Sequence, residues 1–379
     1  MKSLIFVNSG EAGGAEKVVS ILSNNFSIDD VGLVFINDNV FYEFNNNMEV
    51  FILNKNKNKN LIALAIELKK IIKRNDIITV QSHMYRSNYI NILAKLLGSK
   101  HKVQIVNCDC VSTKYVDGLK SIVSKFLIRT LYPFSDLTIT KSKAMLEDLK
   151  LYSNIKNSIV INNPVDIERI NELKHEPSLY FNRDDYKFEK ILVNVGRFHE
   201  QKRQKDIIEA LSMLDESYGL VLIGDGEHLQ ACKKLVIELN LSDRVVFTGK
   251  VKNPFSILSQ CDVFVMSSSC EGFPNALAEA MACSLPIISS DHLSGAKEIL
   301  SLKGNFLDIK QYNDNYSIEE YGVLYPVGNV EELIKSIKYI FDNNMIECYQ
   351  KKSILRVKEY DISKSIKVYQ DVINSYKYD

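Results

Sequence analysis

Short apolar runs alternate with longer stretches of helical periodicity along the whole chain of 379 residues. This alternation is typical of parallel strands that are each followed by a helix. The chain is too long for one ordinary core, so we expect two domains of this kind in tandem. The predicted fold class is α/β, with two Rossmann-like, doubly wound parallel sheets. Such sheets bind ligands beyond the carboxyl ends of their strands, and a ligand in a cleft between two of them is the expected arrangement.

The predicted strands of the first half are short apolar runs at 4–7, 33–36, 77–81, 103–107 and 137–140. The helices between them are predicted at 15–25, 61–74, 88–97, 120–132 and 144–151. In the second half we expect strands at 191–195, 220–223, 245–248, 263–266 and 286–289. Its helices are predicted at 204–214, 227–239, 254–260, 276–283, 330–343 and 363–377. Residues 162–183 lack clear periodicity and are predicted to hold the domain boundary, and the repeat at 54–60 is predicted to be an exposed loop.

Composition excludes several classes of protein. No apolar run approaches the roughly 18–20 residues that span a bilayer, and the first residues are too short an apolar stretch for a signal peptide. The seven cysteines are scattered without framework spacing, which predicts reduced thiols in a cytoplasmic protein. Neither zinc spacing nor an Asp-x-Asp motif is present, so no metal site is predicted.

The formal net charge of zero hides two opposite halves. Residues 1–165 carry 21 Lys and Arg against 14 Asp and Glu, whereas the remainder carries 26 against 33. The neutral total argues against an electrostatically driven nucleic-acid binder, and the basic first half needs another explanation.

A glycine-rich stretch, Gly10–Glu16, follows the first predicted strand and opens a helix. Glycines allow close approach of the backbone, and a helix N-terminus offers free N–H groups to an anion. The stretch is not G-x-G-x-x-G and no acidic residue ends the second strand, so a dinucleotide site is weakly supported. A plain tight turn is the alternative.

Two further strand ends carry polar or glycine-rich loops. Arg197 and Lys202 follow the strand that ends at Gly196, and together a planar guanidinium and a mobile ammonium suit a diphosphate. Solvated surface cations are the alternative. Gly224 begins a Gly-Asp-Gly turn whose backbone allows a base or ribose to pass closely, although such turns are common at strand ends.

The most informative motif is Glu271–Ala282, with sequence EGFPNALAEAMA. Pro274 suits the first turn of a helix, and the free N–H groups around it face whatever the loop faces. Glu271 lies in that loop, while Glu279 lies about a turn into the helix. Two carboxylates placed in this way address different parts of one extended ligand; the alternative is a capped surface helix with exposed glutamates.

Taken in order, these motifs and the YGVLYPVGN stretch at 321–329 resemble the family-4 group of retaining glycosyltransferases that use nucleotide sugars. The resemblance covers nearly the whole chain and is closer in the second half. It implies the GT-B fold: an acceptor-binding domain at 1–170, a donor-binding domain at 171–358, and a closing helix at 359–379 that packs back on the first domain. The stretch at 294–300 and the polar insertion after it resemble bacterial enzymes of O-antigen, capsule and lipid-linked glycan assembly.

The resemblance also implies roles for single residues. Arg197 and Lys202 would hold the donor diphosphate and take up charge as it leaves, and Glu279 would bind the ribose. Glu271 is expected to hold the transferred sugar. The remaining implied donor contacts are mostly backbone groups, at Gly13, Gly14, Gly224, Val251, Gly272, Phe273, Pro274 and Asn275. No metal is required, because these cations and helix ends neutralise the phosphates.

Acceptor residues are expected in the first half. His83 and Arg86 follow one predicted strand, and His83 is as well explained as a structural hydrogen-bonding group. Asp109 stands where many relatives have a histidine, so a direct transfer of role is unsafe.

The predicted helix at 120–132 is amphipathic and basic. Lys125 and Arg129 fall on one face, with Lys120 a turn before, and apolar residues fall largely on another. Such a helix suits an anionic membrane surface, although a core-packed helix with a solvated basic face is the alternative. With the family resemblance, this suggests a lipid-linked oligosaccharide acceptor at the cytoplasmic face of the inner membrane.

We therefore expect transfer of a hexose or N-acetylhexosamine from a nucleoside-diphosphate sugar, a uridine one, to a polyprenyl-diphosphate-linked or other surface glycan. An epimerase of UDP-sugars with the same fold is one alternative. The other is a non-catalytic protein of the assembly machinery that binds sugar nucleotides, and intact Arg197, Lys202, Glu271 and Glu279 argue against it.

Overall fold

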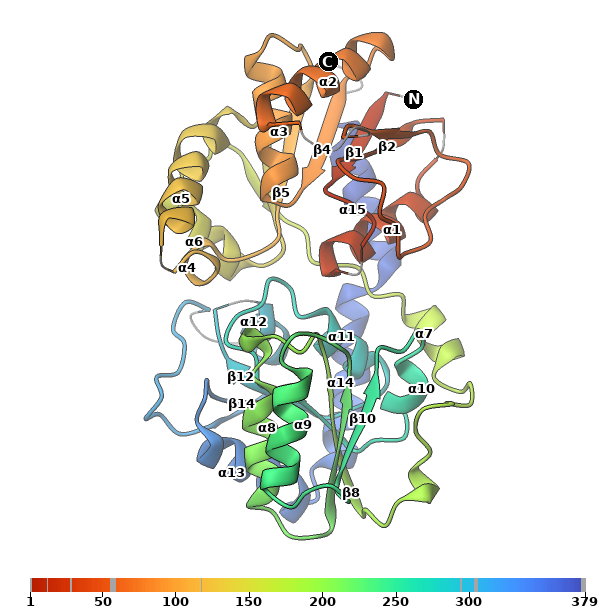
Figure 1. Ribbon diagram of the computed structural model, residues 1–379, viewed down its shortest axis with the longest axis vertical. Helices are drawn as coiled ribbons and strands as arrows, with labels where there is room; N and C mark the ends of the chain where they lie inside the picture. Colours follow the sequence, from red (N-terminus) through yellow and green to blue (C-terminus); the bar gives the residue numbers. More distant parts are fainter. Residues whose placement is uncertain are drawn as a thin grey trace. The chain divides into compact units, whose positions relative to one another are not determined.

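The computed structural model describes residues 2–11, 13–27, 29–54, 59–116, 118–293, 295–302 and 306–375. The chain forms two compact units, one of Met1–Pro164 with Ile362–Asp379 and one of Val165–Asp361. We call them the N-terminal unit and the C-terminal unit. The boundaries predicted from the sequence, after 170 and after 358, lie a few residues away. Each unit holds one seven-stranded sheet with helices packed on it (Figure 1).

The sheet of the N-terminal unit is wholly parallel, in the order β3-β2-β1-β4-β5-β6-β7. Its strands are β1 (Ser3–Val7), β2 (Val31–Phe35), β3 (Val50–Ile52), β4 (Thr79–His83), β5 (Lys102–Asn107), β6 (Leu137–Thr140) and β7 (Ser158–Val160). Its helices are α1 (Gly14–Asn25), α2 (Leu61–Arg74), α3 (Tyr85–Leu96), α4 (Val111–Lys114), α5 (Leu119–Leu131), α6 (Lys143–Tyr152) and α15 (Ile362–Asn374).

The sheet of the C-terminal unit has the order β10-β9-β8-β11-β12-β14-β13. Its strands are β8 (Lys190–Val195), β9 (Tyr218–Ile223), β10 (Val245–Gly249), β11 (Val263–Met266), β12 (Ile287–Asp291), β13 (Ser317–Glu319) and β14 (Gly322–Pro326). Its helices are α7 (Ile167–Leu173), α8 (Gln204–Ser212), α9 (Leu229–Glu238), α10 (Phe255–Leu258), α11 (Asn275–Ala282), α12 (Gly295–Leu300), α13 (Val330–Asp342) and α14 (Ile346–Val357).

The predicted α/β fold class with two doubly wound sheets is confirmed, with one local difference. β13 runs antiparallel to β14, because only Glu320 and Tyr321 connect the two strands and a parallel pair needs a long crossover. The sequence prediction missed β3, β7 and β13, which are three-residue edge strands without a buried apolar run. It also missed β14, which is fully buried but whose apolar run is only Val323–Tyr325, between Gly322 and Pro326. Among the helices it missed α7, which lies in the stretch predicted to lack periodicity and is capped by the Asp166 side chain. It also missed α14 and the shorter helices α4 and α12.

The last helix, α15, completes the core of the N-terminal unit. Ile366, Tyr369 and Ile373 are buried in the same cluster as side chains of β1, β2 and α1. Gln104 on β5 donates a hydrogen bond of 2.8 Å to the Val372 carbonyl, and the buried ammonium of Lys141 hydrogen-bonds the Tyr369 hydroxyl. Residues far apart in the chain are therefore joined in one core.

Four other predictions fall partly on residues outside the described part of the chain: the glycine-rich stretch at 10–16 (residue 12), the loop at 54–60 (residues 55–58), the stretch that begins at Ser294 together with the polar insertion after it, and the end of the predicted helix at 363–377. Among the described helices, none is long and apolar enough to cross a membrane.

A buried histidine directly precedes β5 in the N-terminal unit. His101 is 2% exposed, and its Nε2 and Nδ1 atoms lie 2.8 Å from Asn91 Oδ1 and 3.0 Å from Ser99 Oγ. Burial lowers the pKa of His101 from 6.5 to about 4, assisted by Lys95 and opposed by Asp136. The unfolded chain therefore binds a proton more readily than the folded one, and stability falls as the pH drops from about 6.5 towards 4.

Replacing His101 by glutamine, which keeps one hydrogen-bonding amide there, should weaken this acid sensitivity. Between about pH 7.5 and pH 5 we expect the variant to lose about 2 kcal/mol less unfolding free energy than the parent chain. Urea unfolding followed by circular dichroism measures both, with exposed His175→Gln as the matched control. Parallel pH profiles for parent and His101→Gln would contradict the assignment.

Candidate active site

Two adjacent strands of the C-terminal unit end at a shared edge. β8 and β11 pair in parallel, with Leu192 opposite Val263, so the loops that follow them leave the sheet together. The loops are bonded to each other: the Ser269 backbone N–H donates to the Gln201 carbonyl at 2.8 Å, and the Ser267 hydroxyl donates to the Lys202 carbonyl at 2.8 Å. These bonds fix the loop of Lys202 against the loop of Glu271.

The side chains of Lys202 and Glu271 form an ion pair across these loops. The Lys202 ammonium donates to Glu271 Oε1, and the Ser268 hydroxyl donates to the same oxygen at 2.7 Å. The side chain of Glu271 is 10% exposed and that of Lys202 is 27% exposed. Two residues that the sequence predicts to contact the donor are therefore held directly against each other.

The environment keeps Glu271 ionised. Burial by itself would raise the pKa of this carboxyl. The electrostatic effects of Lys202 and His292, with hydrogen bonds from Lys202 and Ser268, outweigh burial, so the pKa lies below its usual value. Losing the cation would leave a buried carboxylate unpaired, which is strongly unfavourable. The site thus presents a fixed negative charge beside a fixed positive one.

Two side chains near this pair were missed by sequence reasoning. His292 directly follows β12 and is buried; its Nδ1 donates to the Ser290 carbonyl at 2.9 Å, and burial above all lowers its pKa. Its Nε2 has no hydrogen-bond partner in the described part of the chain. Ser268 is the second residue after β11 and follows Ser267. Polar residues immediately after an apolar strand are the signal that could have found both.

Arg197 lies on the same edge, after β8. It is exposed, and its guanidinium makes no hydrogen bond or ion pair with any residue that the structure describes. Its backbone carbonyl accepts a hydrogen bond of 3.1 Å from Gln204, which begins α8. A fixed backbone with an unengaged cation is suited to binding an anion.

The Gly-Asp-Gly turn after β9 packs directly on this loop. Gly224 has φ +143°, and a Cβ atom there would lie 2.0 Å from the Gly196 carbonyl oxygen. The Phe198 N–H donates to the Asp225 carbonyl at 3.0 Å, which joins the two strand exits. The glycine at 224 is thus required for the approach of two loops, whatever it does for a ligand.

The remaining predicted donor residues of this unit lie on or near α11. Gly272 and Asn275 are partly buried, as is Glu279, which lies about a turn into the helix. Phe273 and Pro274 are buried, and the Phe273 ring packs edge-on against Tyr360 at 5.5 Å, so any ligand contact there is with backbone. Val251 is partly buried, follows β10 and packs against the same core.

The predicted residues of the N-terminal unit lie at the carboxyl ends of its strands. Gly13 precedes Gly14, the first residue of α1. His83 ends β4 and is fully buried, 3.3 Å from Gln81 Oε1, with a pKa lowered by burial and by Lys141. Arg86 on α3 is exposed, and Asp109 after β5 lies 3.4 Å from the Lys114 ammonium.

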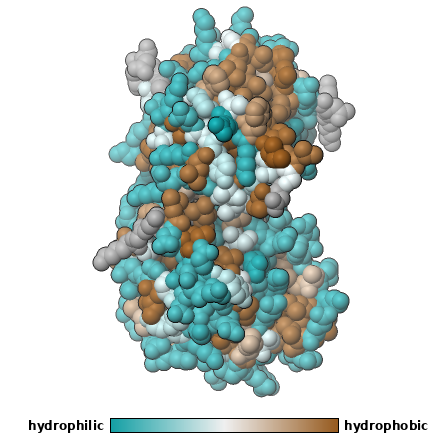
Figure 2. Space-filling model, turned by 90° about the vertical axis from the view of Figure 1, so that its left-hand side faces the viewer, coloured by the Kyte–Doolittle hydropathy of each residue, from teal (hydrophilic) through white to brown (hydrophobic). Residues whose placement is uncertain are grey.

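Helix α5 exposes its apolar face. Ile122 is 67% exposed and Phe126 is 62% exposed, with Leu119 and Val123 exposed beside them. The alternative in which this face packs into the core does not hold for these four residues. Lys120 and Arg129 are exposed on the same helix, while Lys125 lies partly buried over the Tyr152 ring. Figure 2 faces the side on which α5 lies in Figure 1 and shows hydrophobic patches on that unit's surface.

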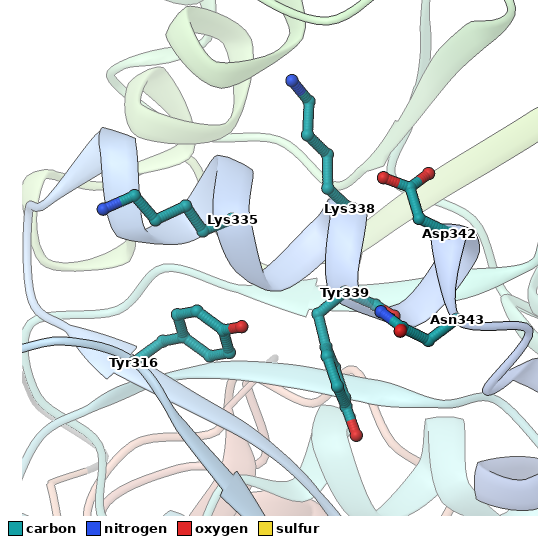
Figure 3. Close-up of a pocket in the computed structure, with 6 residues that line it drawn as sticks. All are labelled: Tyr316, Lys335, Lys338, Tyr339, Asp342 and Asn343. Atoms are coloured by element: carbon teal, nitrogen blue, oxygen red, sulfur yellow. The ribbon is translucent and has the colours of Figure 1, made fainter.

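A small cavity of about 280 Å³ in the C-terminal unit holds none of the predicted residues. Figure 3 shows its lining on and beside α13, where Lys335, Lys338 and Asp342 lie along the helix and Tyr316 faces it. This cavity is therefore separate from the candidate site at the strand ends.

The chain is similar in sequence to known glycosyltransferases. The family described as Glycosyl transferases group 1 matches residues 181–357, which include the loops of Arg197, Lys202 and Glu271. Over 97% of each chain, the protein is 30% identical to the N-acetylgalactosamine-N,N'-diacetylbacillosaminyl-diphospho-undecaprenol 4-alpha-N-acetylgalactosaminyltransferase of Campylobacter jejuni. It is also 27% identical to that organism's N,N'-diacetylbacillosaminyl-diphospho-undecaprenol alpha-1,3-N-acetylgalactosaminyltransferase, over 72% of this chain and 71% of that one.

Solved structures show the same fold. The crystal structure of Anabaena Alr3699/HepE in complex with UDP and glucose superposes with a TM-score of 0.79 at 18% identity, covering 99% of this chain and 100% of that one. The two-sheet architecture is thus that of solved GT-B proteins. The chain belongs to the group 1 glycosyl transferases and is a glycosyltransferase.

The Gly224–Gly196 contact gives a stability prediction. In Gly224→Ala the new Cβ would meet backbone 2.0 Å away, so the loops must separate, and we expect about 3 kcal/mol or more of lost stability. Gly249→Ala is the matched control, because Gly249 also has positive φ (+70°) but open space around it, and should lose only about 1 kcal/mol. Urea unfolding of both variants measures the difference; equal losses would mean that the approach of the loops is not stabilising.

Proposed function

We propose that this glycosyltransferase moves an N-acetylhexosamine or hexose from a UDP-sugar to a polyprenyl-diphosphate-linked glycan, with retention of configuration and without a metal ion. The observation that carries the proposal is the set of side chains at the carboxyl edge of the C-terminal sheet: an unengaged Arg197 beside the Lys202–Glu271 pair. Two cations on the loop between β8 and α8 are what a leaving diphosphate needs, since such charges stabilise the transition state without reorganising.

In this mechanism Arg197 and Lys202 bind the diphosphate, and Glu271 accepts hydrogen bonds from hydroxyls of the transferred sugar. The Ser268 hydroxyl also donates a hydrogen bond to Glu271. The carboxylate therefore keeps its position when the Lys202 ammonium donates one of its hydrogen bonds to a phosphate oxygen instead. Glu279 binds the ribose, and the backbone of Gly272–Asn275, with Gly224 and Val251, contacts the donor. Gly13 and Gly14 supply backbone contacts from the N-terminal unit.

The reaction forms a bond between the sugar's anomeric carbon and an acceptor hydroxyl oxygen as the bond from that carbon to the diphosphate oxygen breaks. The acceptor hydroxyl attacks from the same face of the sugar as the one from which the diphosphate departs. The proton of that hydroxyl passes to the departing diphosphate. Positive charge from Arg197 and Lys202 makes the diphosphate a better leaving group. Nuclear magnetic resonance of the product's anomeric configuration tests retention directly.

The similar proteins support the choice of substrates. The Anabaena structure contains UDP and glucose, which supports a uridine nucleotide as donor. Both Campylobacter jejuni relatives are named for transfer of N-acetylgalactosamine to diphospho-undecaprenol acceptors, which supports a lipid-linked acceptor here. Arg86 and Asp109 are proposed acceptor contacts in the N-terminal unit, whereas buried His83 can act only by positioning neighbours.

We further propose that α5 rests on the cytoplasmic face of the inner membrane. Its exposed apolar side chains, with Lys120, Lys125 and Arg129 on the same helix, combine the two attractions of an interfacial helix: apolar burial and charge. Each cation near an anionic surface contributes about 1 kcal/mol. The protein is thus a peripheral enzyme in which α5 brings the N-terminal unit to its lipid-linked acceptor.

Replacing Arg197 by alanine should lower turnover about 10²–10³-fold, because a charge that stabilises the leaving group is removed. Release of UDP from UDP-N-acetylgalactosamine with a lipid-diphosphate acceptor measures the rate. Arg169→Ala, which removes an exposed arginine on α7, is the matched control and should keep full activity. Near-normal turnover of Arg197→Ala would overturn the diphosphate assignment.

Neutralising α5 should weaken membrane binding. In K120Q/K125Q/R129Q we expect flotation with anionic liposomes to fall by tenfold or more, since three contributions of about 1 kcal/mol are lost. The control K234Q/K338Q/K351Q removes three exposed lysines from α9, α13 and α14. Unchanged flotation of the α5 variant, or an equal loss in the control, would exclude α5 as the membrane contact.

A further inference from the structure

The segment after β2 encloses a second cavity, in the N-terminal unit. The cavity measures about 940 Å³, within the range of small-molecule sites, and lies between residues 38–47, the edge strand β3 and its neighbour β2. None of the residues that line it is among the donor or acceptor residues discussed above. It therefore needs an explanation of its own.

The outer wall of this cavity is fixed by hydrogen bonds rather than left as a free loop. Asn39 and Phe41 bond in both directions to the backbone of Gly10, at 2.7 Å each. The Glu43 carbonyl accepts hydrogen bonds from Ser20 and Asn24 on α1. A wall tied both to the glycine-rich loop and to α1 is preformed for a ligand.

The floor of the cavity is apolar and aromatic. The Phe35 and Phe44 rings meet edge-on with centroids 5.2 Å apart, and Val50 and Ile52 project from the same face of β3. Apolar floors of this kind pack against the C–H faces of a ligand, and they favour a flat, compact group over an extended ionic one.

The rim carries unengaged hydrogen-bonding groups. The side chains of Asp38, Glu43 and Asn46 make no hydrogen bond or ion pair with any residue in the described part of the chain. None of the lining residues is Lys, Arg or His. Acidic and amide groups without a cation repel phosphate and carboxylate, so nucleotides and diphosphates are excluded by charge.

We propose that this cavity is a binding site for a neutral saccharide, separate from the donor site. A pyranose ring combines an apolar face, for Phe44 and Val50, with hydroxyl donors, for Asp38, Glu43 and Asn46. The site lies beside the loop of Gly10 at the carboxyl end of β2, and sugar residues of the glycan acceptor are its natural occupants. The choice of acceptor sugar rests on the proposed function; the recognition of a neutral pyranose does not.

The test is saturation-transfer nuclear magnetic resonance on the full chain without donor. The probes are methyl α-N-acetylgalactosaminide, its α-1,4-linked disaccharide and methyl α-glucoside, and a titration of each gives a dissociation constant. We expect D38A/N46A to weaken binding of the bound probes at least tenfold, while UDP affinity and the thermal unfolding midpoint stay unchanged. D342A/N343A, which removes a carboxylate and an amide from the small cavity of Figure 3, is the matched control and should bind saccharide normally.

The outcomes separate this proposal from the proposed function. If no probe shows saturation transfer from the protein, the saccharide site is overturned, even if the enzyme is an active glycosyltransferase. Equal binding of the probes by the parent chain and D38A/N46A overturns it as well. Binding of methyl α-glucoside alone supports the site while contradicting N-acetylgalactosamine as the acceptor sugar. Loss of saccharide binding on addition of UDP would place the sugar in the donor site and would also overturn the proposal.

Discussion

The partly buried ion pair between Lys202 and Glu271 is the interaction on which the arrangement of the candidate site depends. Each partner sits on a loop that follows a different strand, and the strands are neighbours in the sheet. Removing the Lys202 charge would leave the largely buried carboxylate of Glu271 without its cation, so the two loops are constrained together. The same pair holds opposite charges within one site, which suits a substrate that has hydroxyls at one end and phosphates at the other.

Much of the fold was predictable, because most of the buried parallel strands are apolar runs in the sequence; β14, whose run is only three residues between Gly322 and Pro326, is the exception. β11 and β6 have the predicted ends, and α2 matches its predicted range. Edge strands such as β3 lie partly in solvent and do not need an apolar run, so no pattern marked them. The helix α7 begins at a capping Asp166 that the polar stretch around it concealed.

The candidate site was predictable as a set of residue types but not as a set of contacts. Arg197, Lys202 and Glu271 follow from charge and glycine at strand ends, yet the bond between Lys202 and Glu271 joins positions 69 residues apart in the chain. Spacing carries no information about such a pairing. The saccharide cavity left only a faint signal, the aromatic residues of 41–44 followed by three asparagines, and no rule for catalytic motifs detects it.

The route of the chain has a consequence for synthesis. The N-terminal unit needs Ile366, Tyr369 and Ile373 of α15 to fill its core, but these residues leave the ribosome only after the whole of the C-terminal unit. The usual order, in which the first domain folds first, is thus interrupted. The C-terminal unit is one contiguous segment and can fold during translation. The sheet of the N-terminal unit is made first, but part of its apolar surface stays uncovered until α15 has been synthesised.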